Sequence, residues 1–254
     1  MPINASIYAF EHATRTIGSP SVILIHGAGG THLHWPPQIR RLPNAHVHAI
    51  DLPGHGKSEG RGRQNIAAYC ESVLAWLDAQ KIHQAVFVGH SMGGAIALTM
   101  GLHHPERVLA LGLVGTGARL RVDPVLIENA SRPETFPSVI AAMTERAFGP
   151  KTPERLKKLG AKRMAETRPV VLHSDFLACN TFDIMDSLNQ IQTPCLVLCG
   201  ENDQLTPPRR AQYLSDQLPH AELQIFPQAG HMLQIEEPAA VAQALSDFLE
   251  KIPH

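Results

Sequence analysis

The sequence predicts an α/β fold in which helices cover both faces of a doubly wound, mostly parallel sheet. Short apolar runs alternate along the chain with segments of helical period, and this alternation is typical of parallel sheets. The chain has 254 residues, 44% of them hydrophobic, and can therefore bury one large core without a disulfide or a metal. The stretch 118–191 interrupts the alternation and predicts a helical insertion.

Several apolar runs have the length and composition of strands. Most are apolar throughout, as strands buried on both faces of a parallel sheet must be. The last run alternates between apolar and polar residues, which predicts an edge strand, and residues 4–12 predict a strand ahead of the parallel core. The runs are Ser21–Ile25, His46–Ile50, Ala85–Val88, Val108–Val114, Cys195–Cys199 and Ala221–Phe226.

Helical patterns occupy the segments between these runs. The segment 66–79 gathers apolar residues on one face and suits a helix that crosses over the sheet. The segment 239–249 repeats this pattern and is entered through Pro238, a residue favoured at the first helical position.

Residues 118–191 contain several helical patterns and no strand signal, and they are too many for an unstructured connection. Thr152 as N-cap and Pro153 at the first helical position predict the start of one helix. We expect a helical lid at the end of the sheet where parallel strands deliver functional residues. The core domain then comprises residues 1–117 and 192–254.

Charge and hydropathy exclude several classes of partner. The 22 basic and 23 acidic residues give a net charge of −1, so nucleic acid and anionic membranes are not expected partners. No run reaches the roughly 18 apolar residues of a membrane span. The first ten residues lack the basic start and apolar run of a secretory signal. We expect a cytoplasmic protein.

The four cysteines are scattered along the chain and form neither a disulfide framework nor a zinc-site spacing. Two of them share one apolar run, which indicates small buried thiols and fits a reducing compartment. No metal is expected. The cysteines are Cys70, Cys179, Cys195 and Cys199.

A Gly-x-Ser-x-Gly motif, Gly89-His-Ser-Met-Gly93, lies between a predicted strand and a predicted helix. A serine on so sharp a turn has a strained backbone, and neighbouring chains approach too closely for a side chain at the flanking glycines. Ser91 is thereby placed at a helix N-terminus, where partial positive charge favours a developing anion. The motif predicts Ser91 as a nucleophile.

With four further motifs, the sequence closely resembles the α/β-hydrolase family over nearly its whole length. The resemblance implies the α/β-hydrolase fold and the chemistry of a serine hydrolase. In chain order, the motifs are His26-Gly-Ala-Gly-Gly30, Asp51-Leu-Pro-Gly-His-Gly-Lys-Ser58, the serine motif, Gly200-Glu-Asn-Asp-Gln-Leu-Thr-Pro207 and Gly230-His-Met-Leu-Gln-Ile-Glu-Glu-Pro238.

A serine hydroxyl needs a base to take its proton and a carboxylate to orient that base. In α/β-hydrolases the acid and then the histidine follow the serine along the chain. The resemblance implies Asp203 as the acid and His231 as the base, each just past a predicted strand. Both strand ends point to the Ser91 side of a parallel sheet. We expect His231 to act as general base and then acid, while Asp203 fixes its tautomer.

Most of the 15 histidines are expected to be structural, and His231 differs by its place in the family motif. Some α/β-hydrolases take their acid from the strand before the lid, but here that strand ends in Gly115-Thr-Gly117, without a carboxylate. Asp123 and Asp183 lie in the predicted lid, and we interpret them as solvated residues or helix caps. We interpret as structural His55, His90, His103 and His104, and no metal-ligand spacing accompanies His46 and His48.

Attack on a carbonyl creates an oxyanion, which backbone N–H groups must stabilise, each contributing roughly 3–4 kcal/mol. One donor is expected at Met92, directly after the nucleophile. The resemblance implies Ala28, directly after His-Gly, as the second donor, with Gly29 as the alternative. The glycines of this loop also fit a tight turn, and both interpretations hold together.

The residues at positions 91 and 232 narrow the range of reactions expected within this family. Ser91 disfavours epoxide hydrolases and haloalkane dehalogenases, which resemble this fold but use aspartate, and dienelactone hydrolases, which use cysteine. Met232 stands where plant-type hydroxynitrile lyases carry lysine and carbon–carbon bond hydrolases often carry tryptophan. The latter are disfavoured without being excluded. The expected reaction is hydrolysis of a small-molecule carboxylic ester, with a thioester or lactone as alternatives, and no cofactor is implied.

A non-catalytic receptor with this fold is the other alternative, and the complete set of nucleophile, base and acid favours an enzyme. Apolar residues of the predicted lid fit either the lining of a substrate pocket or packing between lid and sheet. The sequence leaves the oligomeric state and the natural substrate open. These lid residues are Met143, Phe148, Phe176, Phe182 and Met185.

Overall fold

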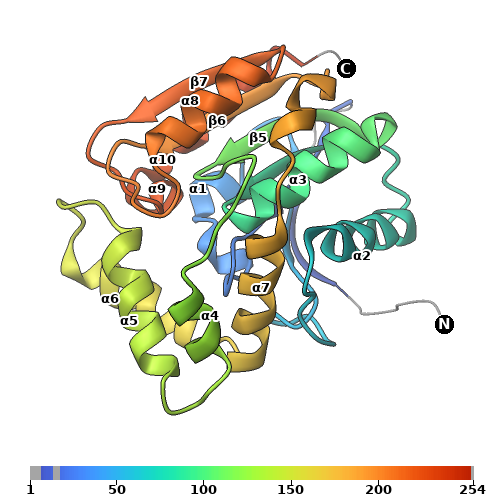
Figure 1. Cartoon of the computed structure of the whole chain (residues 1–254). Helices are drawn as coiled ribbons and strands as arrows, with labels where there is room; N and C mark the ends of the chain where they lie inside the picture. Colours follow the sequence, from blue (N-terminus) through green and yellow to red (C-terminus); the bar gives the residue numbers. More distant parts are fainter. Residues whose placement is uncertain (1–6, 14–17, 253–254) are drawn as a thin grey trace.

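The computed structural model describes residues 7–13 and 18–252 (Figure 1). Its strands are β1 (Tyr8–His12), β2 (Ser21–Ile25), β3 (His46–Asp51), β4 (Ala85–His90), β5 (Val108–Val114), β6 (Cys195–Gly200) and β7 (Ala221–Phe226). They form a seven-stranded sheet in the order β1-β3-β2-β4-β5-β6-β7. Only the β1–β3 pair of this sheet is antiparallel, so the predicted mostly parallel sheet is confirmed.

Each apolar run predicted as a strand is one, with ends shifted by at most two residues. The alternating run forms β7, at the edge of the sheet as predicted. Of the strand expected over residues 4–12, β1 covers the second half, while residues 4–6 lie outside the described part of the chain.

Helices lie on both faces of the sheet, which confirms the doubly wound arrangement. Apolar residues of α2, α3 and α8 pack on one face, and those of α1 and α10 pack on the other. Successive residues of β2, β4 and β6 alternate between the two clusters. The helices are α1 (Pro37–Arg40), α2 (Ile66–Ala79), α3 (Met92–His103), α4 (Pro124–Ala130), α5 (Phe136–Ala147), α6 (Glu154–Ala165), α7 (Pro169–Thr181), α8 (Pro208–Gln217), α9 (Leu233–Glu236) and α10 (Pro238–Leu249).

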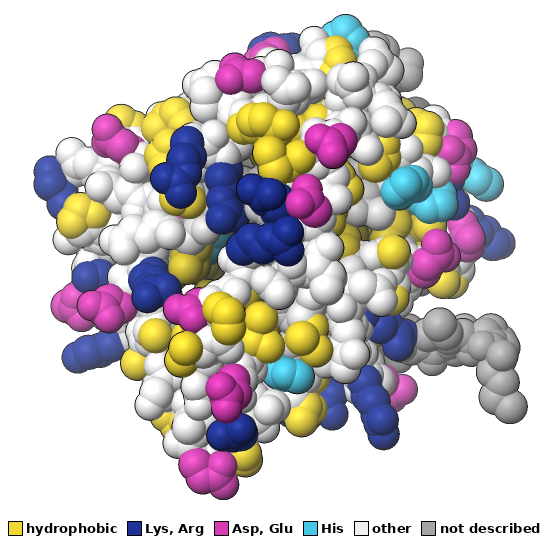
Figure 2. Space-filling model, in the orientation of Figure 1, with side chains coloured by type: hydrophobic (Ala, Val, Ile, Leu, Met, Phe, Trp, Pro, Cys, Tyr) yellow, Lys and Arg dark blue, Asp and Glu magenta, His cyan; other side chains and the backbone are white. Residues whose placement is uncertain are grey.

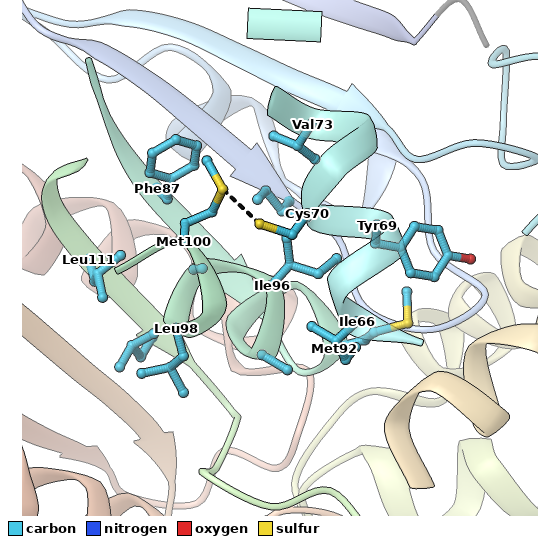
Figure 3. Packing of buried hydrophobic residues seen from close by; sticks show 14 of the residues in the cluster. Ile66, Tyr69, Cys70, Val73, Phe87, Met92, Ile96, Leu98, Met100 and Leu111 are labelled. Atoms are coloured by element: carbon cyan, nitrogen blue, oxygen red, sulfur yellow. Dashed lines mark hydrogen bonds between the residues drawn. The ribbon is translucent and has the colours of Figure 1, made fainter. Parts of the chain in front are cut away.

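Helix α3 packs against α2 and against strands β4 and β5, and every residue from Met92 to Gly101 is buried. Figure 3 shows its side chains packed between those of α2 and strand residues such as Phe87, and the sulfurs of Cys70 and Met100 lie 3.0 Å apart. All four cysteines are free and buried, which confirms the prediction of buried thiols. Burial raises the pKa of the Cys70 thiol to about 12.

The four helices α4 to α7 lie between β5 and β6 in the chain, and Figure 1 shows them gathered together beside the sheet. They share a hydrophobic cluster of their own, built around Phe136, Ile140, Leu172 and Phe176. None of the described helices is both long and apolar enough to cross a membrane.

The predicted N-cap at Thr152 is wrong. Helix α6 begins at Glu154 with Pro153 as its N-cap, one position later than expected. The Thr152 hydroxyl donates to the carboxylate of Glu236 instead of capping the helix. This carboxylate comes from a distant part of the chain, and such a tertiary partner overrides the local capping preference.

We predict that Gly93→Ala destabilises the fold by about 3 kcal/mol or more, because a Cβ there would lie 2.2 Å from the Ile25 carbonyl oxygen. Gly101→Ala in the same helix is the matched control, since its Cβ would meet the end of the Leu111 side chain. The control should change stability by no more than about 1 kcal/mol. Urea denaturation measures both, and equal effects would contradict the prediction.

Candidate active site

The chain reverses sharply at Ser91, between the end of β4 and the start of α3. Ser91 has φ 52° and ψ −114°, a combination that non-glycine residues rarely adopt and that persists only when its surroundings enforce it. Its N–H donates to the Val114 carbonyl at 2.9 Å, and its carbonyl accepts from the Thr116 hydroxyl at 2.8 Å. These bonds to the end of β5 fix the strained residue in place.

His231 and Asp203 are brought together by the loops that follow β7 and β6. Their Nδ1 and Oδ2 atoms lie 2.8 Å apart, and both side chains are buried. Asp203 also accepts bonds from the N–H groups of Leu205 and Thr206 and from the Thr206 hydroxyl. Burial by itself raises the pKa of Asp203, but the adjacent His231 and these bonds outweigh it and lower the pKa. A carboxylate held in this way can accept a hydrogen bond from an Nδ1–H of His231.

Ser91 and His231 line one pocket of about 250 Å³. Residues that follow β2, β4, β5, β6 and β7 all contribute to it, so it opens at the carboxyl ends of the strands, where parallel sheets place their ligands. Two of the apolar residues expected in a lid, Met143 and Phe176, line this pocket. Phe148 packs beside Met232, Phe182 belongs to the core, and Met185 lines a neighbouring groove.

The two expected oxyanion donors Ala28 and Met92 flank Ser91, whereas Gly29 cannot serve. Ala28 lines the pocket with Ser91. Met92 is the first residue of α3, so no carbonyl four residues earlier in the helix accepts its N–H. The N–H of Gly29 donates to the carboxylate of Asp175 at 2.8 Å. The expectation of Gly29 as an alternative donor is therefore corrected.

Asp175, on α7, was not singled out by the sequence, although it joins the insertion to the loop of Ala28. Its carboxylate is fully buried and accepts from the Tyr69 hydroxyl at 2.5 Å, His55 Nε2 at 2.8 Å and the Gly29 N–H. Asp175 is the single acidic residue of α7, and this is the signal that could have marked it. Its partners lie more than 100 residues away in the chain.

His55 and His90, both expected to be structural, brace the loops of the site. His90 Nε2 donates to the His231 carbonyl at 3.0 Å, and burial holds the pKa of His90 well below its ordinary value. Burial also lowers the pKa of His34, which lines the cavity beside Ser91, to about 4. The neutral rings of His34 and His90 add no positive charge beside His231.

The insertion also holds the loop that carries His231. The N–H of Met232 donates to the Ala147 carbonyl at the end of α5, at 3.0 Å. Glu236 accepts from the N–H of Gly230 at 2.9 Å and from the N–H of Gly149 at 2.8 Å. One carboxylate thereby joins the histidine loop to the segment between α5 and α6.

The sequence profile of the alpha/beta hydrolase family matches residues 22–244. The chain belongs to this family. A pimeloyl-[acyl-carrier protein] methyl ester esterase of Vibrio atlanticus (strain LGP32) is 30% identical over 256 residues, covering 91% of this chain and 95% of the relative. The esterase of the same name from Neisseria meningitidis serogroup B / serotype 15 (strain H44/76) is 31% identical over 242 residues, covering 90% and 92%.

Among solved structures, the enol-lactonase from Burkholderia xenovorans LB400 superimposes on this alpha/beta hydrolase with a TM-score of 0.89. It is 25% identical and covers 96% of each chain. Esters and lactones share the acyl–oxygen bond that these enzymes break. The prediction of a carboxylic ester hydrolase is confirmed at the level of reaction class.

We predict that the stabilising contribution of His55 falls as the pH rises. Burial lowers the pKa of His55, but the Asp175 carboxylate outweighs burial and raises it. Both ring nitrogens face acceptors, Asp175 and the Pro53 carbonyl, so the imidazolium is fully bonded. A group with a raised pKa contributes fully below its unfolded value, about 6.5, and loses the contribution as the pH rises through the folded value.

The free energy of unfolding of wild type minus that of His55→Gln should thus be largest near pH 6 and shrink towards pH 9. Urea denaturation across this range measures it, and the other histidines cancel because both proteins contain them. A difference that grows as the pH rises would show that His55 is neutral in the folded protein, and one that does not vary would show that folding leaves its pKa unchanged; either result would contradict the prediction.

Proposed function

We propose that this alpha/beta hydrolase cleaves small-molecule carboxylic esters through an acyl-enzyme on Ser91. The observation that carries the proposal is the buried Asp203–His231 pair, which shares one pocket with a strained serine at the N-terminus of a buried helix. A hydrogen-bonded acid and histidine beside an exposed serine hydroxyl is the arrangement that activates serine as a nucleophile.

In the first half of the reaction, Ser91 Oγ attacks the carbonyl carbon while His231 Nε2 takes the hydroxyl proton. The N–H groups of Ala28 and Met92 stabilise the resulting oxyanion. When the tetrahedral intermediate collapses, the carbon–oxygen bond breaks and His231 gives its proton to the leaving alcohol. In the second half, water attacks the acyl-enzyme with His231 again as base, and the acid leaves as Ser91 regains its proton.

We further propose that residues 118–191 act as a lid on the core formed by residues 1–117 and 192–254. Three helices of the insertion, α4, α5 and α7, contribute side chains to the pocket of Ser91. Two contacts support a lid whose inner surface is fixed in place. The buried Asp175 of the insertion accepts from the Gly29 N–H of the core, and the half-buried Glu236 of the core accepts from the Gly149 N–H of the insertion. Such a lid excludes water and shapes the substrate pocket.

A lactone is the second candidate substrate. It is favoured by the enol-lactonase, which matches this chain over its full fold. A lactone differs from an open ester only in that the leaving alcohol stays attached to the acyl group, so the same residues would act. The two pimeloyl-[acyl-carrier protein] methyl ester esterases favour an open-chain ester instead.

Ser91→Ala should abolish the burst of p-nitrophenol in single-turnover hydrolysis of p-nitrophenyl esters, because no acyl-enzyme can form. The fold should survive, since alanine removes one hydroxyl that lines a pocket. Ser138→Ala, at an exposed serine near the start of α5, is the matched control and should keep the wild-type burst. A full burst in the Ser91 variant would refute the assignment of the nucleophile.

Asp203→Asn should lower kcat by about 10⁴-fold with little change in the fold. The amide can present its N–H₂ group to His231 Nδ1, which favours the tautomer that carries its proton on Nε2 and cannot take one from Ser91. Steady-state hydrolysis together with circular dichroism separates lost activity from lost structure. Activity within tenfold of wild type would indicate another orienting acid.

A further inference from the structure

Four arginines line a groove of about 260 Å³ that adjoins the pocket of Ser91. We call it the arginine groove. Two of its arginines, Arg121 and Arg210, line the pocket as well, so the groove and the pocket share a wall. Figure 2 shows cationic side chains gathered near the centre of this face of the molecule. The groove is lined by Ala118, Arg119, Arg121, Met185, Arg209, Arg210 and Tyr213.

Positive charge in the arginine groove exceeds the negative charge around it. Asp183, which is exposed, pairs with Arg119 at 3.7 Å and with Arg121 at 3.5 Å. Among the described residues, no carboxylate forms an ion pair with Arg209 or Arg210. The groove therefore holds four guanidinium groups against one paired carboxylate.

Two further carboxylates lie towards the pocket, and both are already engaged. Asp123 accepts from the N–H of Val125 at the start of α4. Asp203 is held by His231 and Thr206. Asp203 attracts Arg210 and raises its pKa, which offsets part of the repulsion from the neighbouring arginines.

The positions of Arg209 and Arg210 are unfavourable in the absence of an anion. Both lie in the first turn of α8, and this turn contains no acidic residue. The partial positive charge of a helix N-terminus disfavours cations there. Burial lowers the pKa of Arg210, and the adjacent Arg209 lowers it further. A bound anion would relieve both the mutual repulsion and the unfavourable helix end.

Two of the four guanidinium groups, those of Arg121 and Arg210, are held by backbone carbonyls. Arg210 Nη1 donates to the Arg119 carbonyl at 3.0 Å, and its stem lies against Gly117. Arg121 Nη1 donates to the Asn180 carbonyl at 2.6 Å. Arginine recognises carboxylates and phosphates through paired hydrogen bonds, and each of these guanidinium groups has further N–H donors beyond the one bonded to a carbonyl, although Arg121 Nη2 also faces Asp183 at 3.5 Å.

We propose that the arginine groove binds an anionic group, a carboxylate or a phosphate, carried by the ester substrate itself. The groove is a specificity site that selects esters with a negative charge several bonds away from the reacting carbonyl. This inference rests on the proposed ester hydrolysis and adds to it the class of substrate. Because the groove adjoins the pocket without including Ser91 or His231, it can select a substrate without taking part in the chemistry.

The test compares kcat/KM for esters matched in length. On the acyl side, mono-p-nitrophenyl esters of dicarboxylic acids with about four to eight carbons are paired with the p-nitrophenyl esters of the corresponding monocarboxylic acids. On the alcohol side, the butyrate esters of butanol, 4-hydroxybutyrate and 4-hydroxybutyl phosphate are compared, which separates carboxylate from phosphate. In at least one set, the kcat/KM of wild type should be about tenfold higher for the anionic ester than for the neutral one. This ratio should fall as the ionic strength rises, because salt screens the arginines.

The Arg209→Gln/Arg210→Gln double variant should bring this ratio close to one. Arg121→Gln should lower it partly, and it keeps the test decisive if the double variant does not fold. Arg155→Gln, at an exposed arginine of α6 that lines neither cavity, is the matched control and should keep the wild-type ratio. Asp183→Asn should raise the ratio, because it removes the carboxylate that competes for two of the arginines.

The outcomes separate this inference from the proposed function. Hydrolysis of the neutral esters with no preference for any anionic ester would overturn the arginine groove as a substrate site and leave the esterase proposal intact. A preference that survives the double variant and Arg121→Gln would also overturn it. No hydrolysis of any ester by a folded wild-type protein would refute the proposed function, and the substrate inference with it.

Discussion

The backbone around Ser91 approaches the end of β2 so closely that no side chain fits between them. A Cβ at Gly89 would lie 2.1 Å from the Gly93 carbonyl oxygen, and one at Gly93 would lie 2.2 Å from that of Ile25. This contact sets the position of α3 on the sheet, the strained conformation of Ser91, and the distance from the serine to the loop of Ala28. The sheet, the helix and the proposed oxyanion donors therefore depend on one packing constraint, which only glycine satisfies.

Two carboxylates, the buried Asp175 and the half-buried Glu236, connect the insertion to this rigid centre. Asp175 binds the loop of Ala28 through the Gly29 N–H, and Glu236 binds the loop of His231 through the Gly230 N–H. A buried carboxylate is stable only when donors satisfy it, so each contact fixes both partners. The helices that shape the pocket are thus coupled to the loops that carry the proposed catalytic groups.

The chemistry and the choice of substrate are assigned to different parts of the molecule. The Asp203–His231 pair is buried and joined by a hydrogen bond, which suits the proposed proton transfer because such a step must be insulated from water. The arginine groove is open to solvent and lies on the segment after β5 and the first turn of α8. A change of charge there can alter which ester is bound without moving Ser91.

The sequence by itself determined the strands, the bounds of α2 and α10 to within one residue, and the turn that carries Ser91 between β4 and α3, and its motifs pointed to Asp203 and His231. These follow from local apolar period, from turns that need glycine, and from motifs spanning only a few residues. Only the tertiary structure decided that Asp175 occupies the N–H of Gly29, that Thr152 binds Glu236, and that four arginines form one groove. Each of these depends on partners distant in the chain, which local patterns cannot specify because their proximity arises only when the strands and the insertion pack together.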